Sequence, residues 1–225
     1  MNITFEILRR KSPESSPYTR TVTLDAGVIT VAEALRRINA EQLWNDPVEW
    51  ECSCMQKKCG ACAMLINGKP RLACDTKVSG GVVKLAPLRK FPVVRDLLVD
   101  RSVMFENLKA VGACLESGAA EDVSGTAYDA SRCLQCGCCL EVCPNFYPGG
   151  EFFGAAVMVP TSRIIAETTD EERARISSEY SDHFYRGCGK SLSCKDICPA
   201  GIDTERLLVN SNAVAVWKRK IKARR

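Results

Sequence analysis

The sequence predicts an α+β chain in which about the first ninety residues are β-rich and the remainder is helical. Apolar and polar residues alternate along 3–10 and 18–24, which is the period expected for half-buried strands. From Pro92 onward the apolar residues recur at helical spacing instead. Fourteen cysteines, most of them in groups of short fixed spacing, are distributed over both parts.

The other elements of the N-terminal part follow from local signals. Residues 30–43 have helical spacing, and Thr30 and Glu33 stand in the pattern of a capping box. Asn67-Gly68 suits the two positive φ angles of a tight hairpin turn. Residues 82–88 supply a further strand. Together these signals predict a small mixed sheet with one helix packed across it.

The helical part is expected to begin at Pro92, because Pro87 and Pro92 flank the change of pattern. The predicted domains are therefore residues 1–91 and 92–225. Helices are predicted over 93–111, 150–168 and 169–180, and from Asp203 to 220. The predicted apolar face of the first of these helices carries Val94, Leu97, Leu98, Phe105 and Leu108.

Composition and charge limit the class of protein. No apolar stretch is long enough to cross a bilayer, and the N-terminus lacks the apolar block of a secretory signal, so a cytoplasmic location is expected. Six of the eight residues at 218–225 are basic. This tail is expected either to end a helix favourably or to contact anionic lipid or an acidic partner. Nucleic acid is not expected, because no basic stripe interleaved with aromatic residues accompanies the tail.

The cysteine spacing indicates metal ligands, because disulfides do not persist in a reducing cytoplasm. The first group has the spacing C-x4-C-x2-C-x11-C, by which plant-type ferredoxins hold a [2Fe–2S] cluster. Its members are Cys54, Cys59, Cys62 and Cys74. Gly60 and Ala61 are small, so the loop is expected to curl with backbone N–H groups directed at the cluster. A structural zinc site is the alternative, although such sites usually pair C-x2-C knuckles.

The second group has the spacing C-x2-C-x2-C-x3-C-P of bacterial ferredoxins. Its members are Cys133, Cys136, Cys139 and Cys143, and Pro144 follows the last of them. In such a run the fourth cysteine ligates the other cluster of a pair. Cys138 breaks the register and is predicted to be a small, buried, inert side chain.

The third group repeats this spacing with a serine in the second position. It contains Cys188, Ser191, Cys194 and Cys198, followed by Pro199. By the crossing rule of the bacterial run, Cys198 completes a [4Fe–4S] site with the first three cysteines of the second group. Cys143 joins Cys188 and Cys194 in a site with three thiolates. We predict a [3Fe–4S] cluster there; Ser191 could instead hold a fourth iron, although oxygen suits such clusters poorly.

Taken together, the three groups resemble the iron–sulfur subunit of succinate dehydrogenase and fumarate reductase over nearly the whole chain. Three features support the resemblance. The first is C-x4-C-G-x-C-A-M, followed later by N-G and L-A-C. The others are the segment FPVVRDLLVD with Arg95 and Asp96, and the order of the three cysteine groups. The resemblance implies a β-grasp [2Fe–2S] ferredoxin domain followed by an α-helical ferredoxin domain carrying the other two clusters.

The resemblance also implies an electron-transfer role in a succinate:quinone oxidoreductase or quinol:fumarate reductase. A flavoprotein subunit with covalent FAD would interconvert succinate and fumarate, so no catalytic residue for that step is expected in this chain. Electrons would pass through the three clusters to a quinone beside membrane anchor subunits. That places the chain at the cytoplasmic face of the inner membrane. The alternative is a relay between a different flavoprotein dehydrogenase and another acceptor.

The chain departs from the family pattern on the quinone side. Many members have Trp-Trp where this chain has Tyr147 and Pro148, and a histidine where it has Gly189. Tyr147 is predicted to lie in the quinone vicinity, or simply to pack over a cluster. Menaquinone, a modified quinone site and a different acceptor all fit this pattern.

The remaining candidates are single residues. His183, the only histidine, is expected to face solvent or a cluster, with no pairing partner evident in the sequence. Cys114 is predicted to be buried and Cys52 to be a bystander thiol. Trp50 is expected to shield the first cluster from water, which would affect its reduction potential.

Overall fold

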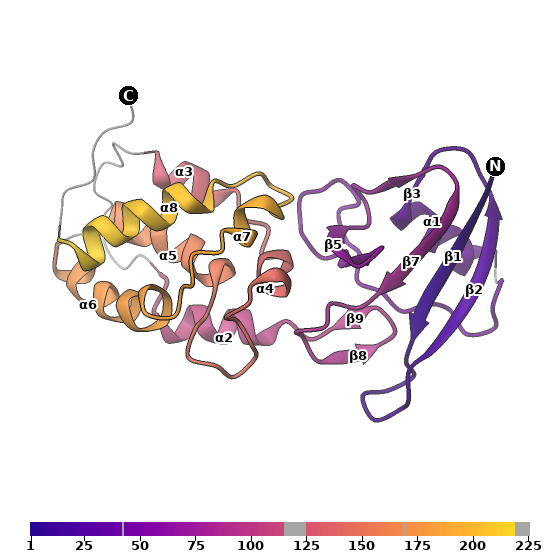
Figure 1. Ribbon diagram of the computed structural model, residues 1–225, viewed down its shortest axis with the longest axis horizontal. Helices are drawn as coiled ribbons and strands as arrows, with labels where there is room; N and C mark the ends of the chain where they lie inside the picture. Colours follow the sequence, from indigo (N-terminus) through magenta and orange to yellow (C-terminus); the bar gives the residue numbers. More distant parts are fainter. Residues whose placement is uncertain (42, 115–124, 169, 219–225) are drawn as a thin grey trace. The chain divides into compact units, whose positions relative to one another are not determined.

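The computed structural model describes residues 1–41, 43–114, 125–168 and 170–218. Its contacts group the chain into two compact units, Met1–Arg101 and Ser102–Arg225 (Figure 1). All but the first residue of the basic tail at 218–225 lies outside the described residues. The expected role of that tail therefore stays a prediction.

A mixed five-stranded sheet with the order β2-β1-β7-β4-β5 forms the first unit, as predicted (Figure 1). Its strands are β1 Asn2–Arg9, β2 Tyr18–Asp25, β4 Ala63–Ile66, β5 Lys69–Leu72 and β7 Gly81–Ala86. β1 pairs with β7 in parallel, and the other neighbours are antiparallel. Two short antiparallel pairs complete the unit: β3 Ile29–Thr30 with β6 Lys77–Val78, and β8 Val93–Arg95 with β9 Leu98–Val99.

Local sequence signals explain several of these elements. Ile3, Phe5 and Ile7 of β1 are fully buried, so the alternation has the expected inward face. Helix α1 Val31–Ala40 begins after Thr30, whose Oγ1 accepts a hydrogen bond from the Glu33 N–H at 3.2 Å, which confirms the predicted cap. The hairpin turn is also confirmed, with φ of 50° at Asn67 and 77° at Gly68.

The predicted helix over 93–111 is wrong in its first half. Residues 93–99 form β8 and β9, and the helix α2 Ser102–Ala110 begins only afterwards. Asp96 prevents a continuous helix, because its φ of 47° is left-handed and its carboxylate accepts hydrogen bonds from Arg9 on β1. The contacts accordingly group residues 92–101 with the first unit, whereas the sequence signals suggested a boundary after residue 91.

The second unit is helical. Its α-helices after α2 are α3 Thr126–Ser131, α4 Cys138–Val142, α5 Ala155–Glu167, α6 Asp170–Tyr180, α7 Ser193–Asp196 and α8 Thr204–Ser211. Two π-helical segments, η1 Ser181–Tyr185 and η2 Asn212–Val216, follow α6 and α8. Ten of the thirteen residues of α5 are buried, and this helix packs against α2, α3, α4, α6 and α8. It is therefore the central helix of the unit.

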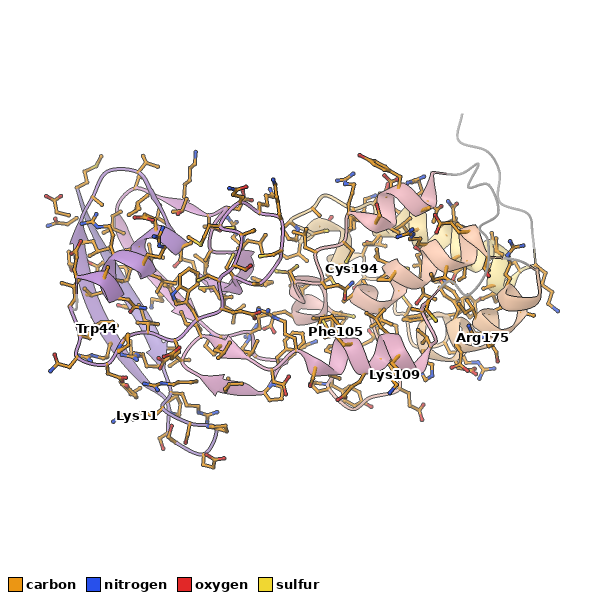
Figure 2. The ribbon with its side chains drawn as sticks, turned by 180° about the vertical axis from the view of Figure 1, so that it is seen from behind. Lys11, Trp44, Phe105, Lys109, Arg175 and Cys194 are labelled. Carbon is orange, nitrogen blue, oxygen red and sulfur yellow. The ribbon has the colours of Figure 1, made fainter. Side chains whose placement is uncertain are left out.

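Three helical details differ from expectation. Phe105 lies on α2 with Lys109 one turn away (Figure 2), and it is 57% exposed instead of forming part of an apolar face. Helix α5 begins at Ala155, not at residue 150. Asp203 does cap α8, accepting from the Arg206 N–H at 3.1 Å, but the described helical segment ends at Val216. Among the described residues, no helix combines the length and apolar character needed to cross a membrane.

Candidate metal centres

The loop between α1 and β4 carries Cys54, Cys59 and Cys62, and Cys74 joins them from the segment after β5. Met55, Lys57 and Gly60 have left-handed backbone with φ of 55°, 58° and 75°, which curls the loop tightly. The N–H groups of Gln56 and Lys58 consequently point at Cys54 Sγ, at 3.3 and 3.2 Å. The Lys57 N–H points at Cys74 Sγ, at 3.3 Å, and the Cys74 N–H at Cys62 Sγ, at 3.5 Å. The backbone thus directs N–H dipoles at the sulfurs, as expected, but the donors are Gln56, Lys57, Lys58 and Cys74 rather than the small residues Gly60 and Ala61.

The four sulfurs of this group fall into two neighbouring pairs. The side chains of Cys54 and Cys59 interact, and so do those of Cys62 and Cys74. Backbone hydrogen bonds from Gln56 and Lys58 lower the pKa of Cys54 to about 7, whereas burial raises the pKa of Cys62 to about 12. Two pairs of thiolates are what a two-iron cluster needs, one pair for each iron.

Arg101 supports this loop, and sequence reasoning did not single it out. Its guanidinium donates to the carbonyls of Ala61 and Ala63 at 2.8 and 3.3 Å, on either side of Cys62. It also forms an ion pair with Glu51 at 2.6 Å, at the start of the loop. The Arg101 side chain is only 10% exposed. One side chain therefore ties both ends of the cysteine loop together.

In the second unit, the second group of cysteines surrounds a tight turn. Gln135 and Gly137 have φ of 49° and 82°, so the chain reverses between the cysteines before α4 begins. One pocket is bordered by Cys133, Cys136, Cys139, Cys194 and Cys198. The structure therefore brings Cys198 to the first three cysteines of the second group, although some sixty residues separate them in the sequence.

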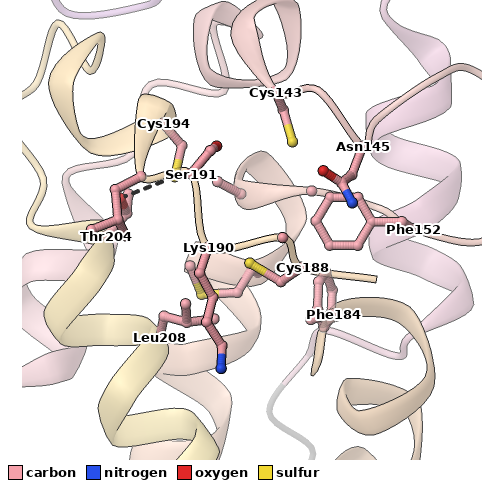
Figure 3. Close-up of a pocket in the computed structure, with 15 residues that line it drawn as sticks. Cys143, Asn145, Phe152, Phe184, Cys188, Lys190, Ser191, Cys194, Thr204 and Leu208 are labelled. Atoms are coloured by element: carbon pink, nitrogen blue, oxygen red, sulfur yellow. Dashed lines mark hydrogen bonds between the residues drawn. The ribbon is translucent and has the colours of Figure 1, made fainter. Parts of the chain in front are cut away.

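A second pocket gathers Cys143 and Cys188 and shares Cys194 with the first pocket (Figure 3). It is bordered by Cys143 at the end of α4, by Cys188 after η1 and by Cys194 on α7. Ser191 also borders it, and its Oγ accepts a hydrogen bond from Ser193 Oγ at 3.4 Å. Left-handed residues Lys190 and Leu192, both with φ of 56°, turn the chain around this pocket. Cys198 thus lies near three cysteines of the second group and Cys143 near two of the third, and the assignment of each sulfur to a cluster stays a prediction.

The partly buried thiols of the second unit fit metal clusters chemically. Burial raises the pKa of Cys133 to about 11 and also raises the pKa values of Cys139 and Cys194, and neighbouring thiols add to each shift. Several buried thiols side by side are stabilised as thiolates when cationic iron lies between them. None of the fourteen cysteines forms a disulfide. Within the described residues, no three His, Cys, Asp or Glu side chains are arranged to hold a single metal ion.

Tyr147 lies on the rim of an open pocket of about 860 Å³ in the second unit. Its ring is 65% exposed and packs over Gly150, where a Cβ atom would lie 2.7 Å from the ring. His183 borders the same pocket. Contrary to expectation, it has partners: its Nδ1 lies 2.7 Å from the Glu151 carbonyl and its Nε2 lies 3.5 Å from Glu179 Oε2.

Other expectations about single residues were mixed. Cys138 is fully buried, as predicted, and the bystander thiol Cys52 is exposed. Cys114 was expected to be buried but is exposed, four residues after the end of α2. Trp50 is partly buried, and its shielding role stays a prediction. The guanidinium of Arg20 lies 4.5 Å from the ring centre of Trp44 (Figure 2), which is a cation–π contact.

Fold and site together define an iron–sulfur protein with a β-rich ferredoxin-like part and a helical part for two clusters. Comparison with family models agrees: residues 4–106 match the 2Fe-2S iron-sulfur cluster binding domain, and residues 129–202 match the 4Fe-4S dicluster domain. The chain is 34% identical over 220 residues to the succinate dehydrogenase iron-sulfur subunit of Bacillus subtilis, covering 89% of this chain and 87% of that protein. The chain belongs to the family of iron–sulfur subunits of succinate dehydrogenase and fumarate reductase.

Two further comparisons bear on the fold and on the type of complex. A chain of the Mycobacterium smegmatis Sdh1 complex in the apo form has a TM-score of 0.77 at 23% identity, with 96% of each chain covered, and thus has the same fold. A subunit of the fumarate reductase (CoM/CoB) of Methanothermobacter marburgensis is 32% identical over 176 residues, which cover 75% of this chain and 35% of that protein.

Proposed function

We propose that this chain is the electron-transfer subunit that connects a FAD-containing succinate dehydrogenase or fumarate reductase flavoprotein with a membrane quinone. The observation that supports this most is the crossing of the cysteine groups. Cys198 borders the pocket of the second group, whereas Cys143 borders the pocket of Cys188 and Cys194. Such crossing is the mark of two clusters held side by side in one polypeptide.

The proposed ligand sets follow from these pockets and pairs. Cys54, Cys59, Cys62 and Cys74 hold [2Fe–2S]; Cys133, Cys136, Cys139 and Cys198 hold [4Fe–4S]; and Cys143, Cys188 and Cys194 hold [3Fe–4S]. When bound, the clusters supply one-electron carriers that need no movement of protein groups. The chain itself fixes the sulfurs, excludes water and directs N–H groups at the thiolates. It needs no acid or base for the dicarboxylate, whose chemistry belongs to the flavoprotein.

Partners and location follow from the same proposal. The chain binds the flavoprotein and membrane anchor subunits, and through them it is held at the cytoplasmic face of the inner membrane. The open pocket beside Tyr147 is our candidate for the quinone vicinity, because it shares Asn145 and Phe152 with the three-cysteine pocket. Its volume of about 860 Å³ is within the range of small-molecule sites.

A direct test is low-temperature EPR with iron and sulfide analysis on anaerobically isolated protein. We expect about nine irons per chain in three cluster types. Colourless protein that contains zinc and no labile sulfide would contradict the proposal. Purification from the native cell should also recover the flavoprotein, and the complex should interconvert succinate and fumarate with a quinone analogue.

A second candidate function keeps the clusters but changes the complex. The similarity to a CoM/CoB-type fumarate reductase subunit and the absence of the family's usual tryptophans and histidine near Tyr147 and Gly189 favour it. In that case the acceptor is not a membrane quinone. Co-purification decides between the two: membrane anchors and quinone reduction support the first function, whereas a complex active with a thiol or another carrier supports the second.

A further inference from the structure

Helix α5 contains a proline in its interior, and this proline has a consequence for the neighbouring cysteine pocket. Pro160 has no N–H, so it cannot form the helical hydrogen bond to the carbonyl of Ala156, four residues earlier. That carbonyl instead accepts a hydrogen bond from Gln135 Nε2 at 2.9 Å. A side chain from the cysteine turn thus occupies a position that an ordinary α-helix would fill itself.

The same nitrogen also reaches a cysteine sulfur. Gln135 Nε2 lies 3.2 Å from Cys133 Sγ, and its two hydrogens can serve the carbonyl and the sulfur together. The Gln135 Oε1 atom is buried and has no hydrogen-bond partner within the described residues. A flipped amide would direct this oxygen at the carbonyl and the sulfur, both of which are acceptors, so the geometry requires the nitrogen on that side.

The proposed three-cysteine ligand set also has a hydrogen bond to sulfur. Cys194 and Thr204 border both pockets, but Cys194 is assigned to the three-cysteine set. Thr204 Oγ1 lies 3.3 Å from Cys194 Sγ (Figure 3), and Thr204 is only 4% exposed. A thiolate ligand can only accept, so the hydroxyl must be the donor when a cluster is bound. Each of the two cysteine pockets of the second unit therefore has a side-chain donor directed at a ligand sulfur.

We propose that Gln135 and Thr204 are positioning residues that set the reduction potentials of the two clusters separately, and that Pro160 keeps Gln135 in place. This inference rests on the proposed function, because it needs a cluster in each pocket. A reduced cluster carries one more negative charge than the oxidised one, and a hydrogen bond to sulfur stabilises the more negative form. Each donor should therefore raise the potential of its own cluster and leave the other unchanged.

The sharpest test is the Pro160→Ala variant, which removes no atom that touches a sulfur. Alanine restores an N–H that competes with Gln135 for the Ala156 carbonyl, so the hydrogen bond that holds Gln135 beside Cys133 should weaken. The substitution favours the helix, so the protein should still fold. Redox titration by EPR of the whole protein should give a more negative potential for the [4Fe–4S] cluster and an unshifted [3Fe–4S] cluster. Gln135→Leu should give the same pattern with a larger shift.

The Thr204→Val variant should give the reverse pattern. Valine keeps the shape of threonine but has no hydroxyl, so only the [3Fe–4S] potential should become more negative, and Thr204→Ser should restore it. Thr161→Val is the matched control, because Thr161 is fully buried on α5 and its hydroxyl donates to the Val157 carbonyl at 2.8 Å instead of to a cysteine sulfur. It should shift neither potential.

The possible outcomes distinguish a failure of this inference from a failure of the proposed function. Wild-type protein with both clusters, but with unshifted potentials in Pro160→Ala, Gln135→Leu and Thr204→Val, overturns this inference and leaves the proposed function standing. Equal shifts of both clusters in every variant, Thr161→Val included, also overturn it, because they would indicate a general loosening of the unit. Wild-type protein without clusters in these pockets overturns the proposed function, and this inference with it.

Discussion

Arg9 and Asp96 form an ion pair of 2.7 Å inside the first unit, with side chains 0% and 1% exposed. Arg9 is the last residue of β1, and Asp96 lies between β8 and β9. The Asp96 carboxylate also accepts the N–H groups of Arg10 and Glu49, both at 3.0 Å. One carboxylate thus fastens residues 92–101 to the sheet, which explains why that segment does not continue the helix of the second unit.

We expect Arg9→Met to destabilise the first unit strongly. Removing one partner leaves the Asp96 charge buried without its counter-ion, which typically costs about 3–5 kcal/mol. The midpoint of urea unfolding measures the loss. Arg36→Met is the control, because the Arg36–Glu33 pair is exposed at 63% and 46%, and its change should stay within about 0.5 kcal/mol. Equal midpoints for the two variants would contradict a structural role of the buried pair.

Arg101→Gln should weaken the first cluster site without unfolding the unit. The guanidinium holds the two carbonyls beside Cys62, and hydrogen bonds from a charged donor contribute about 1.5–3 kcal/mol. The loop should open more often, so the visible absorption of the [2Fe–2S] cluster should bleach about tenfold faster with a chelator. Arg71→Gln, on the exposed face of β5, should bleach at the wild-type rate. If both variants bleach alike, Arg101 does not hold the loop.

Local signals in the sequence predicted those elements whose cause is local. The Thr30 cap and the Asn67-Gly68 turn depend on neighbouring residues, and the structure confirms both. The prediction of a helix over 93–111 was wrong in its first half, although the apolar spacing there is real. Arg9, on a strand far away in the sequence, binds the Asp96 carboxylate, and the backbone at Asp96 is left-handed. Periodicity does not record a partner that lies more than eighty residues away.

In the candidate site, too, features with a local cause could be predicted and features that depend on distant packing could not. Cysteine spacing suggested that Cys198 joins the second group and Cys143 the third, because ferredoxin runs fix ligand geometry within a few residues. The pockets bring these sulfurs close, with Cys194 bordering both pockets, and the ligand assignment stays a prediction. The spacing gave no signal for Thr204, whose contact with Cys194 depends on how α8 packs. Gln135 stands between Cys133 and Cys136 in the sequence, but its proposed role depends on Pro160 in helix α5, which no local pattern indicates. Such supporting residues require the fold before they can be recognised.

Ser191→Cys should convert the three-cysteine site into a four-iron site. Ser191 stands at the second position of the third cysteine group and borders the pocket of Cys143, Cys188 and Cys194. A fourth thiolate would retain the iron that three thiolates lose, so the three-iron EPR signal of the oxidised protein should disappear. Ser193→Cys, two residues away on α7, is out of register and should leave the signal as it is. A persisting three-iron signal in Ser191→Cys would mean that position 191 does not face the missing iron.

Single cysteine substitutions test the crossing of the ligand sets. Cys198→Ala should abolish the [4Fe–4S] cluster, although Cys198 belongs to the third group in the sequence, because its sulfur borders the pocket of the second group. Cys143→Ala should abolish the [3Fe–4S] cluster for the corresponding reason. Cys138→Ala removes a fully buried sulfur assigned to no cluster, so both EPR signals should survive, with a modest loss of stability. The opposite result, in which Cys198→Ala removes the three-iron signal and Cys143→Ala the four-iron signal, would show that each cluster takes its ligands from one cysteine group only.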